Sequence, residues 1–329
     1  MTGKKLIGMA VALAVLAGIA IIQQKGARRR TPEMNSEATL FQGLELNQVD
    51  GVDVFQGSEK ATLAKKDGKW VISSLYNHPA DFKKLADALR AASEVKTGRP
   101  VRAANIDASE YGFDAPKTIV LKSNGKEAAK VEIGARREAS ESAGWANQHF
   151  IRTGSSDSIY LVDYDFRAFD SGSDRWLERS LLSIPSSDVV HVQTSDAELK
   201  EDAGQWTLVG LDDETKELDT AEANKLRGAM QYLNAVSVAD PQASDADLGF
   251  TNAVVYTAST TNQTITVTVG GETEKGRYVR FSGDVPEQLS GWTYVIGSYN
   301  AESFLVPRKK LIKEKETEDP ETDQESSGE

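Results

Sequence analysis

Sequence landmarks that occur twice, at a nearly constant displacement, are the feature that most constrains this 329-residue chain. Trp70 opens a short alternating run after a glycine turn, and Trp206 does the same 136 positions later. The longer matches pair Tyr-Gly-Phe at 111–113 with Leu-Gly-Phe at 248–250, Val-Glu-Ile-Gly at 131–134 with Val-Thr-Val-Gly at 267–270, and Phe-Ile-Arg at 150–152 with Val-Arg at 279–280. One displacement across such unlike landmarks predicts a duplicated module of roughly 130 residues.

Each copy reads as three short strands, one amphipathic helix and four more strands. The clearest strand is Thr264–Val269, in which threonines alternate with isoleucine and valines. This alternation indicates a sheet with one solvated and one buried face, which favours antiparallel pairing. One helix among seven strands is too few for a doubly wound fold, so we predict an α+β fold with two tandem similar lobes.

Two helices are expected, one in each lobe. The spacing of apolar residues predicts the first over Pro79–Ala92, with Asn77 as its cap and proline in its first turn. The second is predicted over Ala221–Val236, opened by Asp219 with a glutamate three residues on, which is the spacing of a capping box. We expect the two repeated tryptophans to pack each sheet against its helix.

The N-terminus predicts a membrane span. Leu6 to Ile22 is an unbroken apolar run without a charge, and at about 1.5 Å per residue it covers roughly 26 Å. One reading is a cleaved secretory signal, with Gly18 and Ala20 as a weak cleavage site. Because the run stays apolar past that site, we favour an uncleaved signal anchor that forms one transmembrane helix.

The orientation of this span is less constrained than its existence. Lys4 and Lys5 precede it, while Lys25 and Arg28–Arg30 follow it, so the positive-inside count is nearly balanced and leans towards a cytoplasmic body. A two-lysine opening before an apolar core is nevertheless the layout of an export signal. We therefore predict a single-pass inner-membrane protein whose body is periplasmic or extracytoplasmic.

These patterns predict six segments in chain order. Residues 174–182 mix charges with large apolar groups, as expected of a connector, and the residues after 315 are acidic without large apolar side chains, as expected of a disordered tail. The predicted segments are a membrane anchor (1–24), a tether (25–38), a first α+β repeat (39–173), a connector (174–182), a second α+β repeat (183–307) and a charged tail (308–329).

Composition removes several function classes. The chain carries 38 Lys+Arg against 50 Asp+Glu, a net charge of −12, which would repel phosphate backbones, so no nucleic-acid partner is expected. The absence of cysteine excludes disulfides, thiolate metal sites and cysteine nucleophiles. Neither a phosphate loop nor a dinucleotide fingerprint is present, and no cofactor is expected.

No motif marks a catalytic or metal site. His78, His149 and His191 lack metal-ligand spacing, and no nucleophile elbow is found. The best metal candidate is an acidic cluster, but Arg167 stands where a calcium loop would carry a third acid, so a solvated turn is the favoured interpretation. Its members are Asp163, Asp165, Asp170 and Asp174.

Aromatic residues outside the strand patterns are candidates for contacting a partner. Trp145 lies in a small polar segment, and Trp176 lies in the connector. Trp292 begins an alternating run and is interpreted as a strand residue. Trp145 and Trp176 are the two residues that we name as candidate partner contacts.

The order of these features resembles a bacterial family known as domain of unknown function 4340. The likeness rests on the apolar N-terminus, the Gly-Lys-Trp-Val at 68–71, the Glu-Tyr-Gly-Phe-Asp-Ala-Pro at 110–116, the Ile-Tyr-Leu-Val at 159–162 and the charged connector with its paired leucines. Members are often encoded beside gliding-motility-type ABC transporter components, which implies an accessory role in the envelope. The second copy lacks Asp-Ala-Pro after Phe250, and the family offers no catalytic residues to transfer.

Two functions from different classes follow. The first is a non-enzymatic, membrane-anchored envelope protein that binds a partner or ligand, with transporter components as partners. The alternative is a membrane-tethered hydrolase of envelope polymers, with acids and histidines brought together across the lobes. The anchor and the absence of a catalytic motif favour the first.

Overall fold

The structure, a computed structural model, describes residues 38–97, 100–101, 107–137, 147–154 and 157–315. Two compact units divide the chain. The first comprises the residues up to Leu46, Leu89–Pro116 and Val131–Phe166, and the second comprises Asn47–Ala88, Lys117–Lys130 and the residues from Arg167 onward. No helix among the described residues combines the length and hydropathy that a bilayer crossing requires, and the Leu6–Ile22 run lies outside them.

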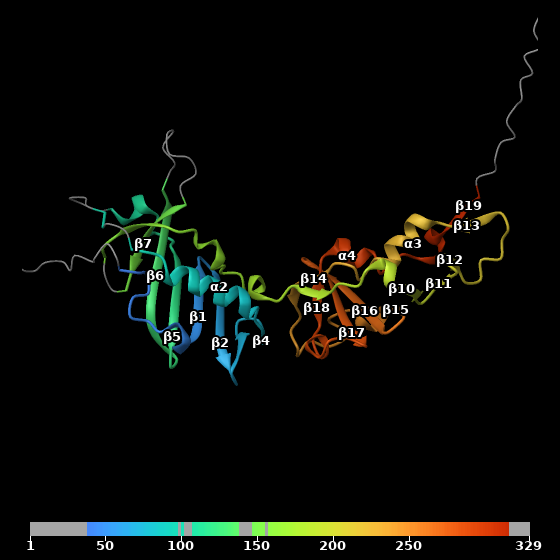
Figure 1. The fold of residues 1–329 in the computed structure, drawn as a ribbon, viewed down its shortest axis with the longest axis horizontal. Helices are drawn as coiled ribbons and strands as arrows, with labels where there is room; N and C mark the ends of the chain where they lie inside the picture. Colours follow the sequence, from blue (N-terminus) through green and yellow to red (C-terminus); the bar gives the residue numbers. More distant parts are fainter. Residues whose placement is uncertain (1–37, 98–99, 102–106, 138–146, 155–156, 316–329) are drawn as a thin grey trace, which may run out of the picture. The chain divides into compact units, whose positions relative to one another are not determined.

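The first large sheet has eight strands in the order β4-β3-β2-β1-β5-β6-β7-β8 (Figure 1). Strands β1 to β5 belong to the second unit, and β7 and β8 belong to the first. Its strands are β1 (Val49–Gln56), β2 (Glu59–Lys66), β3 (Lys69–Ile72), β4 (His78–Pro79), β5 (Lys117–Ser123), β6 (Lys126–Arg136), β7 (Gln148–Thr153) and β8 (Tyr160–Asp163).

The second large sheet has nine strands in the order β12-β11-β10-β15-β16-β17-β18-β14-β9. They are β9 (Ser180–Leu182), β10 (Val189–Gln193), β11 (Glu198–Asp202), β12 (Gln205–Leu208), β14 (Leu233–Val238), β15 (Val254–Thr260), β16 (Thr264–Thr273), β17 (Gly276–Gly283) and β18 (Tyr294–Ile296). A separate two-stranded ribbon pairs β13 (Lys216–Leu218) with β19 (Ile312–Glu314).

Helices are few and short beside the strands. The α-helices of the described residues are α2 (Phe82–Ser93), α3 (Thr220–Arg227) and α4 (Ser298–Glu302). The 3-10 turns are η1 (Leu46–Gln48), η2 (Ala108–Tyr111), η3 (Phe166–Ala168), η4 (Ser173–Trp176), η5 (Ser186–Asp188), η6 (Phe250–Asn252), η7 (Glu287–Leu289) and η8 (Arg308–Leu311). The fold is therefore α+β with mostly antiparallel sheets, as the alternating patterns predict.

Both large sheets contain the same seven-strand arrangement. The order β3-β2-β1-β5-β6-β7-β8 in the first corresponds to β12-β11-β10-β15-β16-β17-β18 in the second. The register between β6 and β7 shifts between Ile133 and Arg136, and that between β16 and β17 shifts between Val269 and Glu272. These irregularities are again 136 positions apart, so the two sheets agree with the prediction of two similar lobes.

The first helix begins later than predicted. Pro79 belongs to β4, and Asn77 has a φ of 60° in the preceding turn, so it does not cap the helix. The side chain of Asp81 takes that role, because its Oδ1 accepts a hydrogen bond from Lys84 N at 2.9 Å. The helix then runs over Phe82–Ser93 and buries Leu85 completely.

The second helix ends earlier than predicted. Asp219 caps it as expected, accepting hydrogen bonds from two backbone N–H groups, but α3 stops at Arg227 with Gly228 as its C-cap. Of the residues that the prediction assigned to the rest of the helix, 228–232 form a turn and those from Leu233 onward belong to β14. The strand contains Val236 and Val238, and β-branched residues fit a pleated sheet better than a helix.

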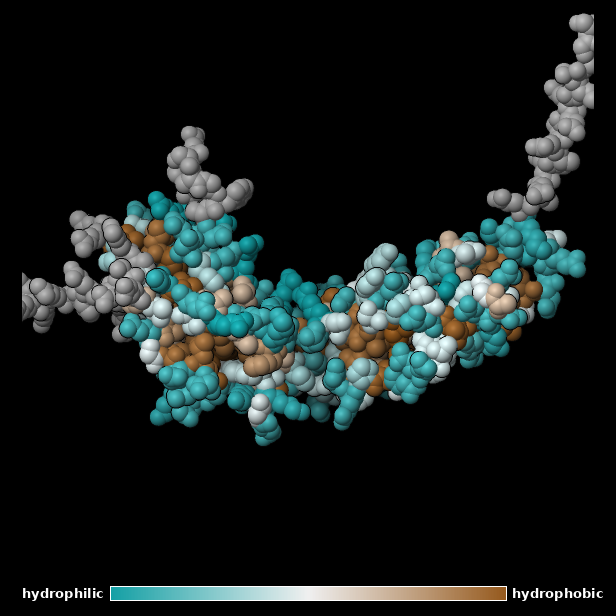
Figure 2. Space-filling view, in the orientation of Figure 1, coloured by the Kyte–Doolittle hydropathy of each residue, from teal (hydrophilic) through white to brown (hydrophobic). Residues whose placement is uncertain are grey.

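The ordered chain also extends beyond the predicted boundary at Pro307. Arg308–Leu311 forms η8, and Ile312–Glu314 pairs with β13. Leu311 is fully buried, which anchors this C-terminal segment, and the description ends at Lys315. Figure 2 shows hydrophobic surface around β14, β16 and β18 between hydrophilic margins.

Candidate functional site

A cavity of about 240 Å³ lies beside β17 and the segment that precedes β18. It belongs entirely to the second unit. Its walls combine one arginine with aromatic and aliphatic side chains and with an acid at the rim. The residues that define it are Asp240, Leu248, Arg280, Phe281, Trp292 and Thr293.

Local sequence places a phenylalanine ring beneath the arginine. Gly249 adopts a φ of 70°, and a Cβ there would lie 2.6 Å from Gly271 Cα, so only glycine fits this turn. The turn brings Phe250 against β17, where the Cζ of Arg280 lies 4.0 Å from the centroid of its ring. This cation–π contact holds the plane of the guanidinium over the ring.

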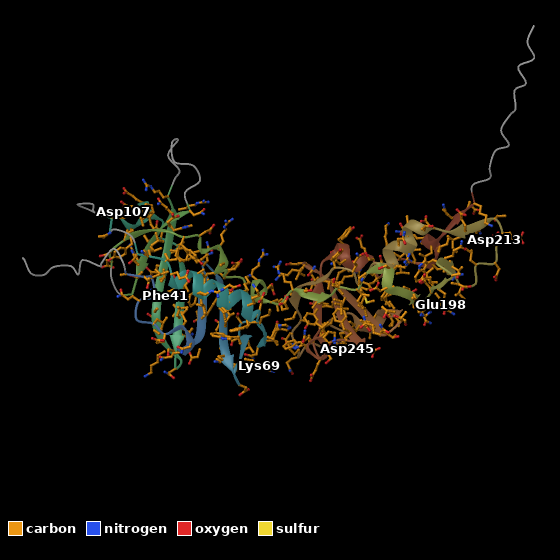
Figure 3. All side chains as sticks on the ribbon, in the orientation of Figure 1. Phe41, Lys69, Asp107, Glu198, Asp213 and Asp245 are labelled. Atoms are coloured by element: carbon orange, nitrogen blue, oxygen red, sulfur yellow. The ribbon has the colours of Figure 1, made fainter. Side chains whose placement is uncertain are left out.

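Hydrogen bonds fix two of the three guanidinium nitrogens. Arg280 Nε donates to Thr293 Oγ1 at 2.8 Å, and Nη1 lies 2.7 Å from Asp245 Oδ1. No partner of Nη2 is found among the described residues. Asp245, labelled in Figure 3, is 66% exposed, so its ion pair contributes only about 0.2–1 kcal/mol.

The first unit contains the same arrangement of arginine on phenylalanine. The Cζ of Arg152 lies 4.2 Å from the ring centroid of Phe113, and the glycine before that ring, Gly112, again has a positive φ of 75°. The acid differs, because Glu132 approaches Arg152 from the neighbouring strand at 3.9 Å. The Nε of Arg152 is buried without a hydrogen-bond partner among the described residues. The two sheets thus share the cation but not its polar surroundings.

One wall of the cavity is fixed by contacts to His78. The rings of Trp292 and His78 meet edge to face at 4.5 Å, and His78 Nε2 lies 3.3 Å from Tyr294 Oη. Burial lowers the pKa of His78, so its imidazole is neutral near neutral pH. Its Nδ1 lies 2.8 Å from the carbonyl oxygen of Pro79, which can only accept, so Nδ1 carries the proton. Trp292 itself precedes β18 rather than belonging to the strand.

This arrangement is suited to holding an anion. The Arg280 guanidinium is charged at every physiological pH and offers donors in a fixed plane. The aromatic and aliphatic walls would contact an apolar group attached to that anion.

The two candidate partner contacts have different outcomes. Trp145 lies outside the described residues. Trp176 is fully buried, donates from Nε1 to Asp170 O at 2.8 Å, and has Lys84 Nζ 5.2 Å from its ring centroid. Its side chain therefore holds the connector in place and does not face solvent.

The connector is fixed by neighbours on both sides. Asp81 N donates to Trp176 O at 2.8 Å, and Ala235 N donates to Arg179 O at 2.8 Å. Asp174 accepts a 2.6 Å hydrogen bond from Ser237 Oγ and pairs with Lys275. Desolvation lowers the pKa of Lys84 beside this segment.

The predicted acidic cluster does not converge on one point. Asp170 accepts a hydrogen bond from Gly172 N and faces Arg175, while Asp174 pairs with Lys275. Among the described residues, no three His, Asp or Glu side chains are arranged to hold a metal ion. His149 Nδ1 contacts Tyr164 O, and His191 pairs with Glu198 across β10 and β11, so the histidines serve separate local roles.

Sequence reasoning missed the residues of the cavity. The signal was nevertheless present, since the matched segments 150–152 and 279–280 each end in arginine, and the matched glycine turns each end in phenylalanine. Pattern matching could not show that the folded chain brings each phenylalanine ring against the arginine of the same copy. Asp245 had no counterpart in the first copy and could not be found in this way.

Comparison with known proteins gives one match. Residues 70–253 match the family described as "Domain of unknown function (DUF4340)", which confirms the resemblance seen in the motifs. The curated proteins and the solved structures give no match.

Proposed function

The chain belongs to the DUF4340 family, and from that premise we propose that it is a membrane-anchored envelope protein that binds a partner or ligand and catalyses no reaction. The observation that carries this proposal is the uncharged apolar run Leu6–Ile22 ahead of two sheets of the same strand order. Such a run is long enough to span a bilayer, and the two sheets of one strand order provide the soluble body that would meet a partner.

The cavity beside Arg280 supports the binding part of the proposal. It is concave, its walls mix polar with aromatic and aliphatic groups, and it holds one charged group fixed by contacts within the chain, as ligand sites commonly do. The finer proposal, an accessory of ABC transporter components with the body outside the cytoplasm, rests on the resemblance and on the layout of the N-terminus.

Photo-crosslinking in intact cells tests the partner. A photoreactive amino acid in place of Trp292 in the full chain is expected to capture an integral membrane protein. The same probe in place of Glu201, an exposed residue on β11, is the control and is expected to capture far less of it. Capture of cytosolic proteins alone at Trp292 would contradict the proposal.

Protease accessibility tests the side of the membrane. A protease added to spheroplasts is expected to degrade the body, whereas intact cells protect it. Protection in both preparations, with degradation only after lysis, would place the body in the cytoplasm and overturn the envelope assignment.

A further inference from the structure

We infer that the cavity beside Arg280 is a binding site for a monocarboxylate that carries a short apolar group. This inference rests on the proposed binding function and names the ligand class of the same site. The inference rests on two neighbouring features. The guanidinium of Arg280 stacks on the ring of Phe250, and Arg280 lines a cavity whose other walls include Trp292, Phe281 and Leu248.

Contacts within the chain already orient the guanidinium of Arg280. Thr293 holds Nε, and the ring of Phe250 holds the plane, so Arg280 does not need to be ordered when a ligand binds. On the terminal edge of the guanidinium, formed by Nη1 and Nη2, the exposed side chain of Asp245 pairs with Nη1. Two parallel donors of this kind match the two oxygens of a carboxylate.

Asp245 already places a carboxylate oxygen against Nη1 of Arg280. It shows that this edge of Arg280 accepts the proposed chemistry. The side chain of Asp245 is 66% exposed and that of Arg280 is 37% exposed, so their pair is solvated and exchangeable. A ligand carboxylate would replace Asp245 and gain Nη2 as a second donor.

The charge and size of the cavity restrict the ligand further. Asp240 lines the same cavity and would repel a second negative charge. Its Oδ1 accepts from Gln242 N at 2.8 Å, which keeps the carboxylate at the rim. The volume of about 240 Å³ lies below the range of roughly 300–1,000 Å³ typical of sites for drug-sized ligands. A monocarboxylate with a few carbon atoms fits both limits.

Titration of the purified full-length chain in detergent, followed by tryptophan fluorescence and by calorimetry, tests the inference. The probes are isovalerate and N-acetylvaline, which represent a free acid and the end of a peptide, each with its neutral amide as a control. Both acids, or one of them, should bind at least about tenfold more tightly than the matching amide. The acid that binds better identifies the source of the carboxylate.

Three variants make the test specific. Arg280→Gln should abolish the preference for the acid, while Asp245→Asn should raise affinity about two- to fivefold by removing the competing carboxylate. Arg277→Gln, on the same strand but outside the cavity lining, is the matched control and should bind as the unaltered chain does.

Equal binding of acid and amide, no binding of either, or unchanged binding by Arg280→Gln would overturn the inference. Unchanged or weaker binding by Asp245→Asn would also count against it, and this variant covers the case in which Arg280→Gln does not fold. The titration needs no membrane partner, so its failure is distinguishable from failure of the proposed function in cells.

Discussion

At the scale of single residues, glycines that touch backbone carbonyls hold the two sheets to the same local shape. A Cβ at Gly134 would lie 2.2 Å from Tyr111 O, and one at Gly270 would lie 2.6 Å from Leu248 O. These contacts place the turns before Phe113 and Phe250 directly against β6 and β16. The stacked arginines depend on that approach.

Gly134→Ala should therefore destabilise the chain by about 2–3 kcal/mol, because the carbonyl cannot move away without shifting the turn. The free energy of unfolding in urea measures this cost. Gly297→Ala is the control, since nothing lies within 4 Å of its Cβ position and its φ is −61°. It should cost no more than about 1 kcal/mol. Equal effects of the two changes would refute the steric explanation.

Because of Tyr294, the free energy of unfolding should fall as the pH rises in the alkaline range. Burial raises the pKa of Tyr294 to about 12, against about 10 in the unfolded chain. Between these values the folded chain holds the proton and the unfolded chain does not, so its contribution is complete below pH 10 and is lost as pH rises towards 12. Tyr294→Phe should reduce the fall in unfolding free energy over this window by up to about 1.4 kcal/mol per pH unit. Tyr232→Phe, at a 73% exposed side chain, should leave the fall unchanged.

At the scale of elements, the start of helix α3 was predicted correctly from the sequence, whereas its end was not. Asp219 was identified as a cap from its spacing alone, because capping requires only a local pattern. The end of α3 at Arg227 was not, since the residues after it include apolar side chains that suit a helix or a strand equally. Pairing with β18 decides for the strand, and no local pattern reports a partner about 60 residues away.

The cap of α3 should be measurable in isolation. Asp219 Oδ1 accepts from Ala221 N at 2.9 Å and from Glu222 N at 3.1 Å. Asp219→Ala should lower the free energy of unfolding by about 1 kcal/mol, whereas Asp219→Asn, which keeps the acceptor, should stay close to the unaltered chain. Thermal unfolding followed by circular dichroism separates the two. A loss of the same size in both variants would show that the charge matters, not the hydrogen bond.

The ribbon of β13 and β19 gives the C-terminal segment a structural role. Leu311 is fully buried beside it, so Leu311→Ala should cost about 2–5 kcal/mol. Lys309→Ala, two residues earlier and exposed, should change stability by less than about 0.5 kcal/mol. Urea unfolding of the full chain compares them, and a small effect of Leu311→Ala would mean that burial of this side chain does not hold the C-terminal segment in place.

At the scale of the whole molecule, the proposed anchor accounts for how the chain would be held. We expect the full-length chain to stay with membranes during alkaline carbonate extraction. Leu13→Arg places a charge in the middle of the apolar run, at a cost of about 2.5–3.5 kcal/mol for a transmembrane helix, and should move a large part of the chain to the soluble fraction. Leu13→Ile is the control and should remain in the membrane fraction. Quantitative release of the unaltered chain would argue against an anchor.

The repeat made the fold class and the similarity of the two lobes accessible from the sequence, because periodicity and displacement are properties of the chain alone. The strand order of each sheet was not predicted, since it depends on which strands pair. The cavity was not accessible in that way. It is lined by Leu248, Arg280 and Trp292, which come from three separate segments of the chain and meet only in the folded structure. The burial of Trp176 was not accessible either, since the sequence shows a large aromatic residue among charges and suggests a partner contact, whereas the structure buries the side chain completely.

The close approach of Gly134 and Gly270 to neighbouring carbonyls also sets a limit on divergence. If both sheets descend from one ancestral gene segment, substitutions could accumulate freely after Phe113 and Phe250, where Asp-Ala-Pro in one copy stands against Thr-Asn in the other. They could not accumulate at glycines that have no room for a methyl group. Family members should accordingly vary the acid beside each arginine, and with it their ligand preferences, while leaving these glycines untouched.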